Sequence, residues 1–307
     1  MIKIFKKYLS NIIKKVFSEE IEKELILKAK NLSQKNKQIK KLKNLSEVEF
    51  RVFSQWGEDG IIDWVINKFP NIPKSFLEIG TQDYKESNTR FLLINKNWEG
   101  FLIEGNDKEV KKIKSQRIYW KHQLKVKNEF ITKENINNVI KKLNVPKKLG
   151  LLSLDIDGVD YWILKKLSIL EPSIVICEYN SLYGLNKSIT VPYKKDFDRS
   201  KEHYSNLYYG ASIKAFIDLM KTKKYFLLGT NTAGNNAFFM RNNFLKEINK
   251  IIKEKKIFTS KFRESRNKNG NLTFLSKKES LLLIQNQFFI DLNDNKRKKL
   301  INIKLNN

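Results

Sequence analysis

The chain has 307 residues, and 60 lysine and arginine side chains against 33 aspartate and glutamate side chains give a formal net charge of +27. Hydrophobic residues make up 41% of the chain, which excludes a disordered polymer, and the single cysteine excludes a disulfide framework and a multi-cysteine zinc site. No apolar run approaches the roughly 20 residues of a membrane span, and the N-terminus lacks the pattern of a secretory signal, so we expect a soluble cytoplasmic protein.

The positive charge is concentrated at the two ends of the chain. Residues 1–50 carry a net charge of +7 and residues 245–307 carry +10, which leaves +10 for the long middle part. Only eight of the basic residues are arginine, the side chain that proteins use for bidentate contacts to bases. The charge therefore indicates lysine-rich flanks, and we expect no nucleic-acid partner.

Residues 1–45 are predicted to be helical. Apolar residues recur at helical spacing with lysines opposite, and they are Ile2, Phe5, Leu9, Ile12, Ile13, Val16 and Phe17. A basic amphipathic helix can lie on an anionic membrane, so residues 1–17 are a candidate contact with the inner face of the membrane. Packing of the helix against the domain or a partner is the alternative. We treat residues 1–49 as a basic helical extension.

From Phe53 onward, short apolar runs alternate with helical patterns, which predicts a mostly parallel sheet with helices on both faces. Strands are predicted at 76–80, 100–105, 118–120, 150–155, 173–178, 225–229 and 237–240. Helices are predicted near 58–68, 86–96, 107–115, 133–143, 160–168 and 212–223. The last two strands are joined by a loop too short for a helical crossover, so they should form an antiparallel hairpin. The fold class is therefore α/β, with a doubly wound, Rossmann-like, seven-stranded sheet over residues 50–244.

The tail, residues 245–307, is rich in lysine and asparagine. It contains the apolar runs 281–284 and 288–290. We predict helices and a frayed end for this segment, as a second extension of the central domain.

Ligands of open α/β sheets bind at the carboxyl ends of the strands, so the residues that end each strand are the candidate site. Gly80 ends the first predicted strand beside Glu78, and a glycine allows close approach of a ligand to the backbone. Glu104 ends the second strand, where an acidic side chain accepts hydrogen bonds from ribose hydroxyls in nucleotide-binding folds. This pattern predicts a nucleotide-type site.

A second group of polar residues follows the fourth and fifth predicted strands. Asp155 and Asp157 are two residues apart, and Glu178 and Asn180 repeat that spacing on the next strand. Because neighbouring strands lie about 4.8 Å apart, we expect the four side chains to converge. Oxygen ligands suit Mg²⁺, Mn²⁺ or Ca²⁺ rather than zinc. A cation there would lower the pKa of a substrate hydroxyl.

Candidate proton acceptors are few. His203 lies in a polar, tyrosine-rich loop and is a candidate general base, with a surface role as the alternative; Asp157 is the second candidate. We expect His122 to be structural. The simpler roles of the neighbouring acids are a helix cap for Asp160 and a turn before Gly158 for Asp157.

Seven segments carry motifs that occur together in one enzyme family. They are FSQWGEDG at 53–60, FLEIG at 76–80, ESNTRFL at 86–92, LSLDIDGVDYW at 152–162, ICEYNSL at 176–182, YGAS at 209–212 and NTAGNNAFF at 231–239. The chain resembles the FkbM-type branch of S-adenosylmethionine-dependent methyltransferases, which have the class I fold. The resemblance covers about residues 50–241 and omits both tails.

The resemblance implies S-adenosylmethionine as cofactor, with Mg²⁺ or Mn²⁺ as a candidate second cofactor. The implied cofactor-binding residues are Glu78, Gly80, Thr81, Asn88, Glu104, Gln123 and Asp155, with Gln123 expected after the third strand. The implied metal ligands are Asp155, Glu178 and Asn180. The chain departs from the family pattern at Gln82, where a second glycine is common, and at Tyr179, which separates an acid and an amide that are adjacent in cation-dependent O-methyltransferases.

The leading hypothesis is an O-methyltransferase that acts on a sugar hydroxyl of a surface polysaccharide precursor, with His203 or Asp157 taking the proton. Its partner would be a small-molecule or glycan acceptor. One alternative is a metal-dependent glycosyltransferase, because the pattern Asp155-Ile156-Asp157 can hold a metal-bound sugar nucleotide. The other alternative is a non-catalytic binding protein that acts through its basic tails.

Overall fold

The computed structural model describes residues 2–303 and 305, with side chains from Glu20 onward. Its main sheet has seven strands in the order β3-β2-β1-β4-β5-β8-β7. The strands are β1 (Ser75–Ile79), β2 (Glu99–Glu104), β3 (Leu124–Asn128), β4 (Leu151–Leu154), β5 (Ile174–Glu178), β7 (Tyr225–Thr230) and β8 (Asn236–Arg241). β1 to β5 pair in parallel, whereas β8 pairs antiparallel with both β5 and β7. The expected α/β fold with a terminal antiparallel hairpin is confirmed.

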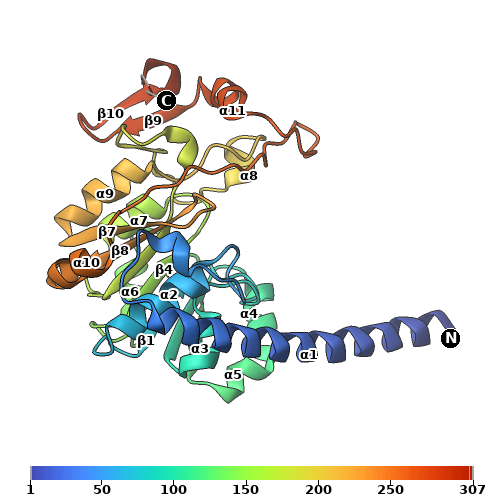
Figure 1. Ribbon diagram of the computed structural model, residues 1–307. Helices are drawn as coiled ribbons and strands as arrows, with labels where there is room; N and C mark the ends of the chain where they lie inside the picture. The colour runs from blue at the N-terminus through green and yellow to red at the C-terminus, as the bar shows by residue number, and fades with distance from the viewer. Residues whose placement is uncertain (1, 304, 306–307) are drawn as a thin grey trace.

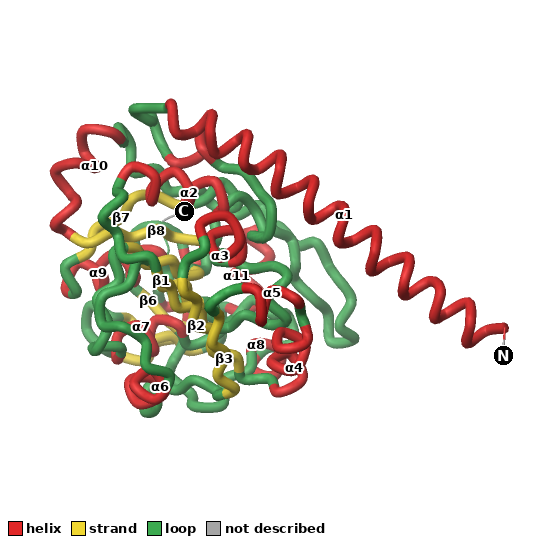
Figure 2. Tube along the Cα trace, turned by 90° about the horizontal axis from the view of Figure 1, so that it is seen from below, coloured by secondary structure: helices red, strands yellow, loops and turns green. Residues whose placement is uncertain are grey.

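Helices cover both faces of this sheet, as a view along a second direction also shows (Figure 2). The helices are α1 (Ile2–Gln38), α2 (Glu58–Lys68), α3 (Arg90–Lys96), α4 (Asp107–Ser115), α5 (Arg117–Lys121), α6 (Ile136–Lys142), α7 (Asp160–Lys166), α8 (Arg199–Glu202), α9 (Ile213–Thr222), α10 (Leu245–Ile251) and α11 (Lys277–Ile284). Successive strand residues point to opposite faces, so Phe76 packs in the core with α2 and α3 whereas Leu77 packs with α6, α7 and α9. Burial on both faces explains why the strands are continuous apolar runs.

The prediction of a third strand at residues 118–120 is wrong. Residues 117–121 form helix α5, in which Trp120 is exposed, and β3 follows at Leu124–Asn128. A three-residue apolar run does not distinguish a strand from one helical turn, and β3 carries lysines because it is an edge strand. Gln123 therefore precedes β3 and lies at the amino end of that strand, away from the edge where ligands bind.

The C-terminal tail is only partly helical, so the expectation of helices and a frayed end is wrong for its last part. β9 (Phe288–Asp291) and β10 (Lys296–Lys299) form a hairpin, and β9 also pairs with β6 (Ile189–Thr190) in a second sheet of three strands. Asn295 adopts a positive φ of 55° in the connecting turn, which asparagine tolerates. Phe289 is fully buried in a small core with Tyr183 and Ile284. The tail thus packs on the loop that follows β5.

The C-terminal half of helix α1 packs on the domain, whereas its N-terminal half extends away from the domain (Figures 1 and 2). Ser33 donates a hydrogen bond to Asp63 of α2 at 2.6 Å, and Asn36 donates to the backbone oxygen of Val48 at 2.9 Å. The predicted membrane-contacting face of residues 1–17 lies outside the described side chains. No helix in the described part of the chain is both long and apolar enough to cross a bilayer.

Candidate functional site

Two adjoining cavities open at the carboxyl ends of β1, β2, β4 and β5. The Glu104 cavity has a volume of about 600 Å³, and its walls include Glu104 and the apolar side chains of Phe130, Ile131 and Ile156. The Glu178 cavity has a volume of about 650 Å³ and is lined mainly by polar residues. Four residues line both cavities, and they are Gly80, Gln82, Asp155 and Asp157. The candidate site therefore has an apolar part and a polar part that meet between β1 and β4.

Gly80 sits where these two cavities meet, and its backbone has φ +83°. A Cβ atom added at this position would lie 1.7 Å from the backbone oxygen of Asp155. The Gly80 amide donates a hydrogen bond to the backbone oxygen of Ile103 at 3.0 Å. Only glycine allows the ends of β1 and β4 to approach this closely while β1 stays paired with β2.

Glu78 is buried and orders the loop before α3. Its carboxylate accepts hydrogen bonds from the hydroxyls of Ser87 and Thr89 and from the backbone amide of Asn88. Burial is the main cause that raises the pKa of Glu78, and these donors oppose it. The Asn88 side chain in turn donates to the Ser153 hydroxyl of β4 at 3.1 Å. The structure therefore places both Glu78 and Asn88 in the lining of the Glu178 cavity.

Glu104 links the end of β2 to the loops around it. Its carboxylate accepts hydrogen bonds from the backbone amides of Thr81, Gln82 and Asn106 at 2.8–3.0 Å. Oε2 accepts two of these hydrogen bonds and Oε1 accepts one, so Oε1 keeps a lone pair, and Glu104 lines the cavity. The Thr81 hydroxyl is buried and has no hydrogen-bond partner in the described part of the chain. Glu104 is therefore held in place with acceptor capacity that faces the apolar cavity.

Three carboxylates converge at the ends of β4 and β5. One oxygen each of Asp155, Asp157 and Glu178 lies within 4.8 Å of the others. Burial, followed by repulsion from neighbouring carboxylates, raises the pKa of both Asp155 and Glu178 well above the ordinary values. No hydrogen-bond donor among the described residues reaches the Glu178 carboxylate. The site thus holds closely spaced negative charge that a cation or a proton would relieve.

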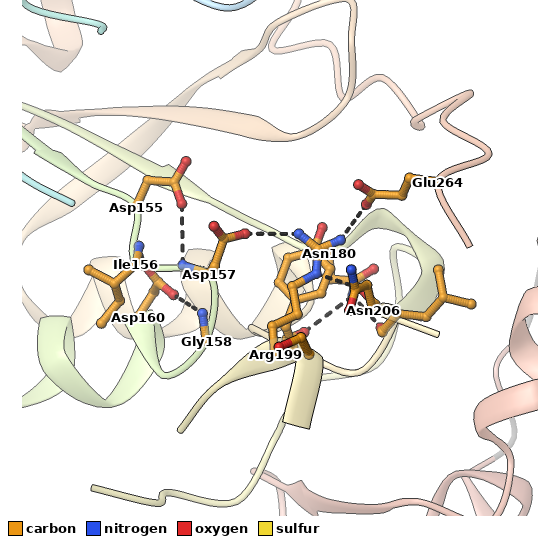
Figure 3. Close-up of polar contacts among 12 residues, drawn as sticks. Asp155, Ile156, Asp157, Gly158, Asp160, Asn180, Arg199, Asn206 and Glu264 are labelled. Carbon is orange, nitrogen blue, oxygen red and sulfur yellow. Dashed lines mark hydrogen bonds and ion pairs between the residues drawn. The ribbon is translucent and has the colours of Figure 1, made fainter. Parts of the chain in front are cut away.

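Arg199 provides the positive charge beside this cluster (Figure 3). Its guanidinium contacts Asp157 at 2.8 Å and forms an ion pair with Glu264, while its face lies 3.8 Å from the centre of the Tyr209 ring. The side chain is only 16% exposed. Asp157 itself is exposed and has a φ of 54°. Arg199 therefore compensates one carboxylate of the three.

The structure does not bring Asn180 into this group. The Asn180 carboxamide donates to the backbone oxygens of Leu207 and Tyr209 and accepts from the amide of Leu182. It is 2% exposed. Its polar atoms are engaged with the backbone, so the metal-ligand role implied for it is not supported, and Asp157 takes its place in the cluster. The Asp160 carboxylate is likewise buried and accepts from the amides of Ile156 and Gly158.

His203 lies outside the described lining of both cavities. Its Nδ1 atom lies 2.6 Å from the Ser205 hydroxyl, and its ring stacks on Tyr204 at 4.6 Å. Burial lowers its pKa below the ordinary value. His122 contacts Asn97 at 3.2 Å, near the amino end of β3. Neither histidine is therefore placed to contact a ligand in the two cavities.

A segment of the C-terminal tail forms a wall that sequence analysis missed. Residues 256–264, the covering segment, follow α10; Tyr179 donates to the backbone oxygen of Phe258 at 2.6 Å, and the Ser260 amide donates to Ser181 at 3.1 Å. Phe262 stacks on Trp56 with ring centres 4.8 Å apart. Phe262 and Glu264 line the Glu178 cavity. No local sequence pattern marks this segment, because it is held by contacts to residues distant in the chain.

No protein-family model matches the chain, and no curated protein shows a significant match. Among solved structures, the N-terminal domain of EvdMO1 with SAH bound is 9% identical with a TM-score of 0.39, over 69% of this chain and 94% of that one. A putative O-methyltransferase from Klebsiella pneumoniae is 12% identical with a TM-score of 0.39, over 60% and 79%. A putative caffeoyl-CoA O-methyltransferase from Staphylococcus aureus is 15% identical with a TM-score of 0.39, over 59% and 82%.

Proposed function

We propose that the protein is an S-adenosylmethionine-dependent O-methyltransferase. The observation that carries the proposal is the Glu104 cavity: an apolar-walled hollow at the carboxyl edge of the sheet, with an oriented carboxylate at the end of β2. This combination of apolar walls and a carboxylate suits a nucleoside, whose ribose hydroxyls donate to an acid at that position. The resemblance of the seven motif segments to the FkbM-type branch supports the same assignment.

In this proposal the Glu104 cavity would hold the cofactor and the Glu178 cavity would hold the acceptor. Glu104 would accept hydrogen bonds from the ribose, and Phe130, Ile131 and Ile156 would surround the base. The cofactor supplies a methyl group already activated on a sulfonium. Gly80 and Asp155 line both cavities, so an acceptor in the Glu178 cavity would meet the cofactor there. The covering segment limits the access of water, which favours transfer over hydrolysis.

The carboxylate cluster is a proposed site for Mg²⁺ or Mn²⁺. Asp155, Asp157 and Glu178 offer oxygen donors close enough to share one ion, and such donors suit these cations. A bound cation would compete with Arg199 for Asp157 and would lower the pKa of an acceptor hydroxyl. The proton of that hydroxyl would pass to Asp157, since His203 lines neither cavity. The acceptor we propose is a sugar hydroxyl of a surface polysaccharide precursor.

Isothermal titration calorimetry tests cofactor binding. We expect the native chain to bind S-adenosylhomocysteine, and we expect Glu104→Gln to weaken that affinity about tenfold, because a charge-assisted hydrogen bond to the ribose is lost. Glu109→Gln is the matched control: Glu109 lies on α4 and pairs with Lys112 at the surface. Its affinity should equal that of the native chain. Absence of binding by the native chain would refute the proposal, and binding of a sugar nucleotide instead would support the glycosyltransferase alternative.

Thermal unfolding with added Mn²⁺ tests the cation site. We expect Mn²⁺ to raise the melting temperature of the native chain, because an ion that binds only the folded state stabilises it. Asp155→Asn removes a ligand and should abolish the increase. Asp107→Asn, at an exposed ion pair on α4, should leave the increase intact. An equal response of the native chain and Asp155→Asn would show that Mn²⁺ binds elsewhere.

A further inference from the structure

A third cavity lies between the covering segment and α11. It has a volume of about 270 Å³, and its lining includes Ser260, Lys261, Arg263, Lys277 and Ser280. Figure 1 shows how this arises: the segment between α10 and α11 runs across the molecule before the chain turns into α11. The cavity shares Asn235 and residues 262–264 with the Glu178 cavity, so the two spaces meet at these residues.

The basic side chains of this third cavity lack acidic partners. Within the described residues, Lys261, Arg263 and Lys277 form no ion pair. Arg263 lies over the Phe274 ring at 5.6 Å, which holds its guanidinium at the boundary between the two cavities. The carboxylate in the lining is that of Glu264, which is already paired with Arg199. The third cavity therefore carries uncompensated positive charge, whereas its neighbour carries the carboxylate cluster.

A serine in this lining offers a hydroxyl to the cavity. The Ser280 side chain is 4% exposed, and its hydroxyl, which forms no hydrogen bond with a described residue, is open to the cavity. The amide groups at the N-terminal end of α11 are not available to a ligand, because the Ser276 hydroxyl and the Glu279 carboxylate form a capping box there. A hydroxyl that is open to a cavity and is not engaged by the protein can donate a hydrogen bond to a ligand there. Ser280 is thus a second, independent feature that points to a polar ligand.

We propose that this cavity binds a phosphate group. Lysine ammonium groups and the arginine guanidinium neutralise a phosphate and donate to its oxygens, and the Ser280 hydroxyl donates one further hydrogen bond. Because the cavity adjoins the Glu178 cavity, a phosphorylated sugar can place its phosphate here and a hydroxyl beside the carboxylate cluster. This assignment of the acceptor as a sugar phosphate rests on the proposed function, whereas phosphate binding itself does not.

Calorimetric titration at constant ionic strength tests the site with inorganic phosphate and with a hexose 1-phosphate. We expect saturable binding of both to the native chain. The double variant Lys261→Gln/Lys277→Gln should weaken both affinities about tenfold, and Ser280→Ala should weaken them about threefold. The control Lys278→Gln changes an exposed lysine outside the cavity lining and should bind as the native chain does.

The outcomes separate this proposal from the proposed function. Absence of saturable phosphate binding, or equal affinities in the native chain and the double variant, would overturn the phosphate site. Binding of inorganic phosphate but not of the hexose 1-phosphate would overturn the sugar phosphate as acceptor. Phosphate binding without S-adenosylhomocysteine binding would leave the phosphate site standing and refute the methyltransferase.

Discussion

Replacing Gly80 with alanine is expected to destabilise the fold by about 3 kcal/mol or more, since strain and overpacking add. The added Cβ atom would lie 1.7 Å from the backbone oxygen of Asp155, and backbone atoms cannot move aside without disturbing the pairing of β1 with β4. The positive φ of +83° adds the strain of a conformation that alanine disfavours. Urea unfolding at equilibrium measures the effect as a lower midpoint.

Gly270→Ala is the matched control for this variant. Gly270 has a φ of +80°, nearly the value of Gly80, but a Cβ atom there meets no other atom within 4 Å. It therefore carries the backbone strain without the contact, and we expect a loss of only about 1 kcal/mol. If both variants lost the same stability, the contact with Asp155 would have no part in the requirement for glycine at position 80.

In buffer without divalent cations, Glu178→Gln is expected to stabilise the protein by about 2 kcal/mol at pH 7, although most substitutions of buried residues destabilise. The Glu178 side chain is half-buried, has no hydrogen-bond donor among the described residues and is repelled by Asp155 and Asp157. The attraction of Arg199 offsets only part of this cost. A neutral amide removes the desolvation of a charge. The same variant should lose the stabilisation by Mn²⁺. Glu178 would therefore lower the stability of the cation-free protein and contribute to cation binding.

The stabilisation by Glu178→Gln should depend on pH. Because burial raises the pKa of Glu178 above the ordinary value of 4.5, the folded state binds the proton more tightly than the unfolded state. The native chain therefore loses stability as the pH rises above about 4.5 through the raised pKa, and the variant lacks this loss. Urea unfolding should show little difference between the two near pH 4 and a growing difference toward pH 7.

Glu86→Gln serves as the control for the glutamate substitution. Glu86 lines the same cavity but is exposed. The free energy of unfolding of the Glu86→Gln variant should therefore differ from that of the native chain by less than about 0.5 kcal/mol at both pH 4 and pH 7. A destabilised Glu178→Gln at pH 7 would mean that the carboxylate accepts hydrogen bonds that hold the site together.

Most of the fold could be predicted from local patterns. The apolar runs at β1, β2, β4 and β5 end at polar residues, and both the runs and the helices between them follow from burial on two faces. β3 was misplaced because its sequence LKVKN is that of an edge strand, with lysines that meet solvent. The hairpin of β9 and β10 was missed because it is stabilised by packing of Phe289 on residues about a hundred positions away.

The residue pattern is sufficient to show which strand ends carry acids and to mark Gly80, Glu104, Asp155 and Glu178 as candidate site residues. Period-two alternation and the common carboxyl edge of parallel strands are sufficient for that. Contacts between distant segments fix the partner of each polar atom: the Asn180 carboxamide donates to the backbone, and Arg199 contacts Asp157. They also place the covering segment and the basic third cavity beside the site. These contacts join residues far apart in the chain, so their partners are fixed by packing and leave no local signal in the sequence.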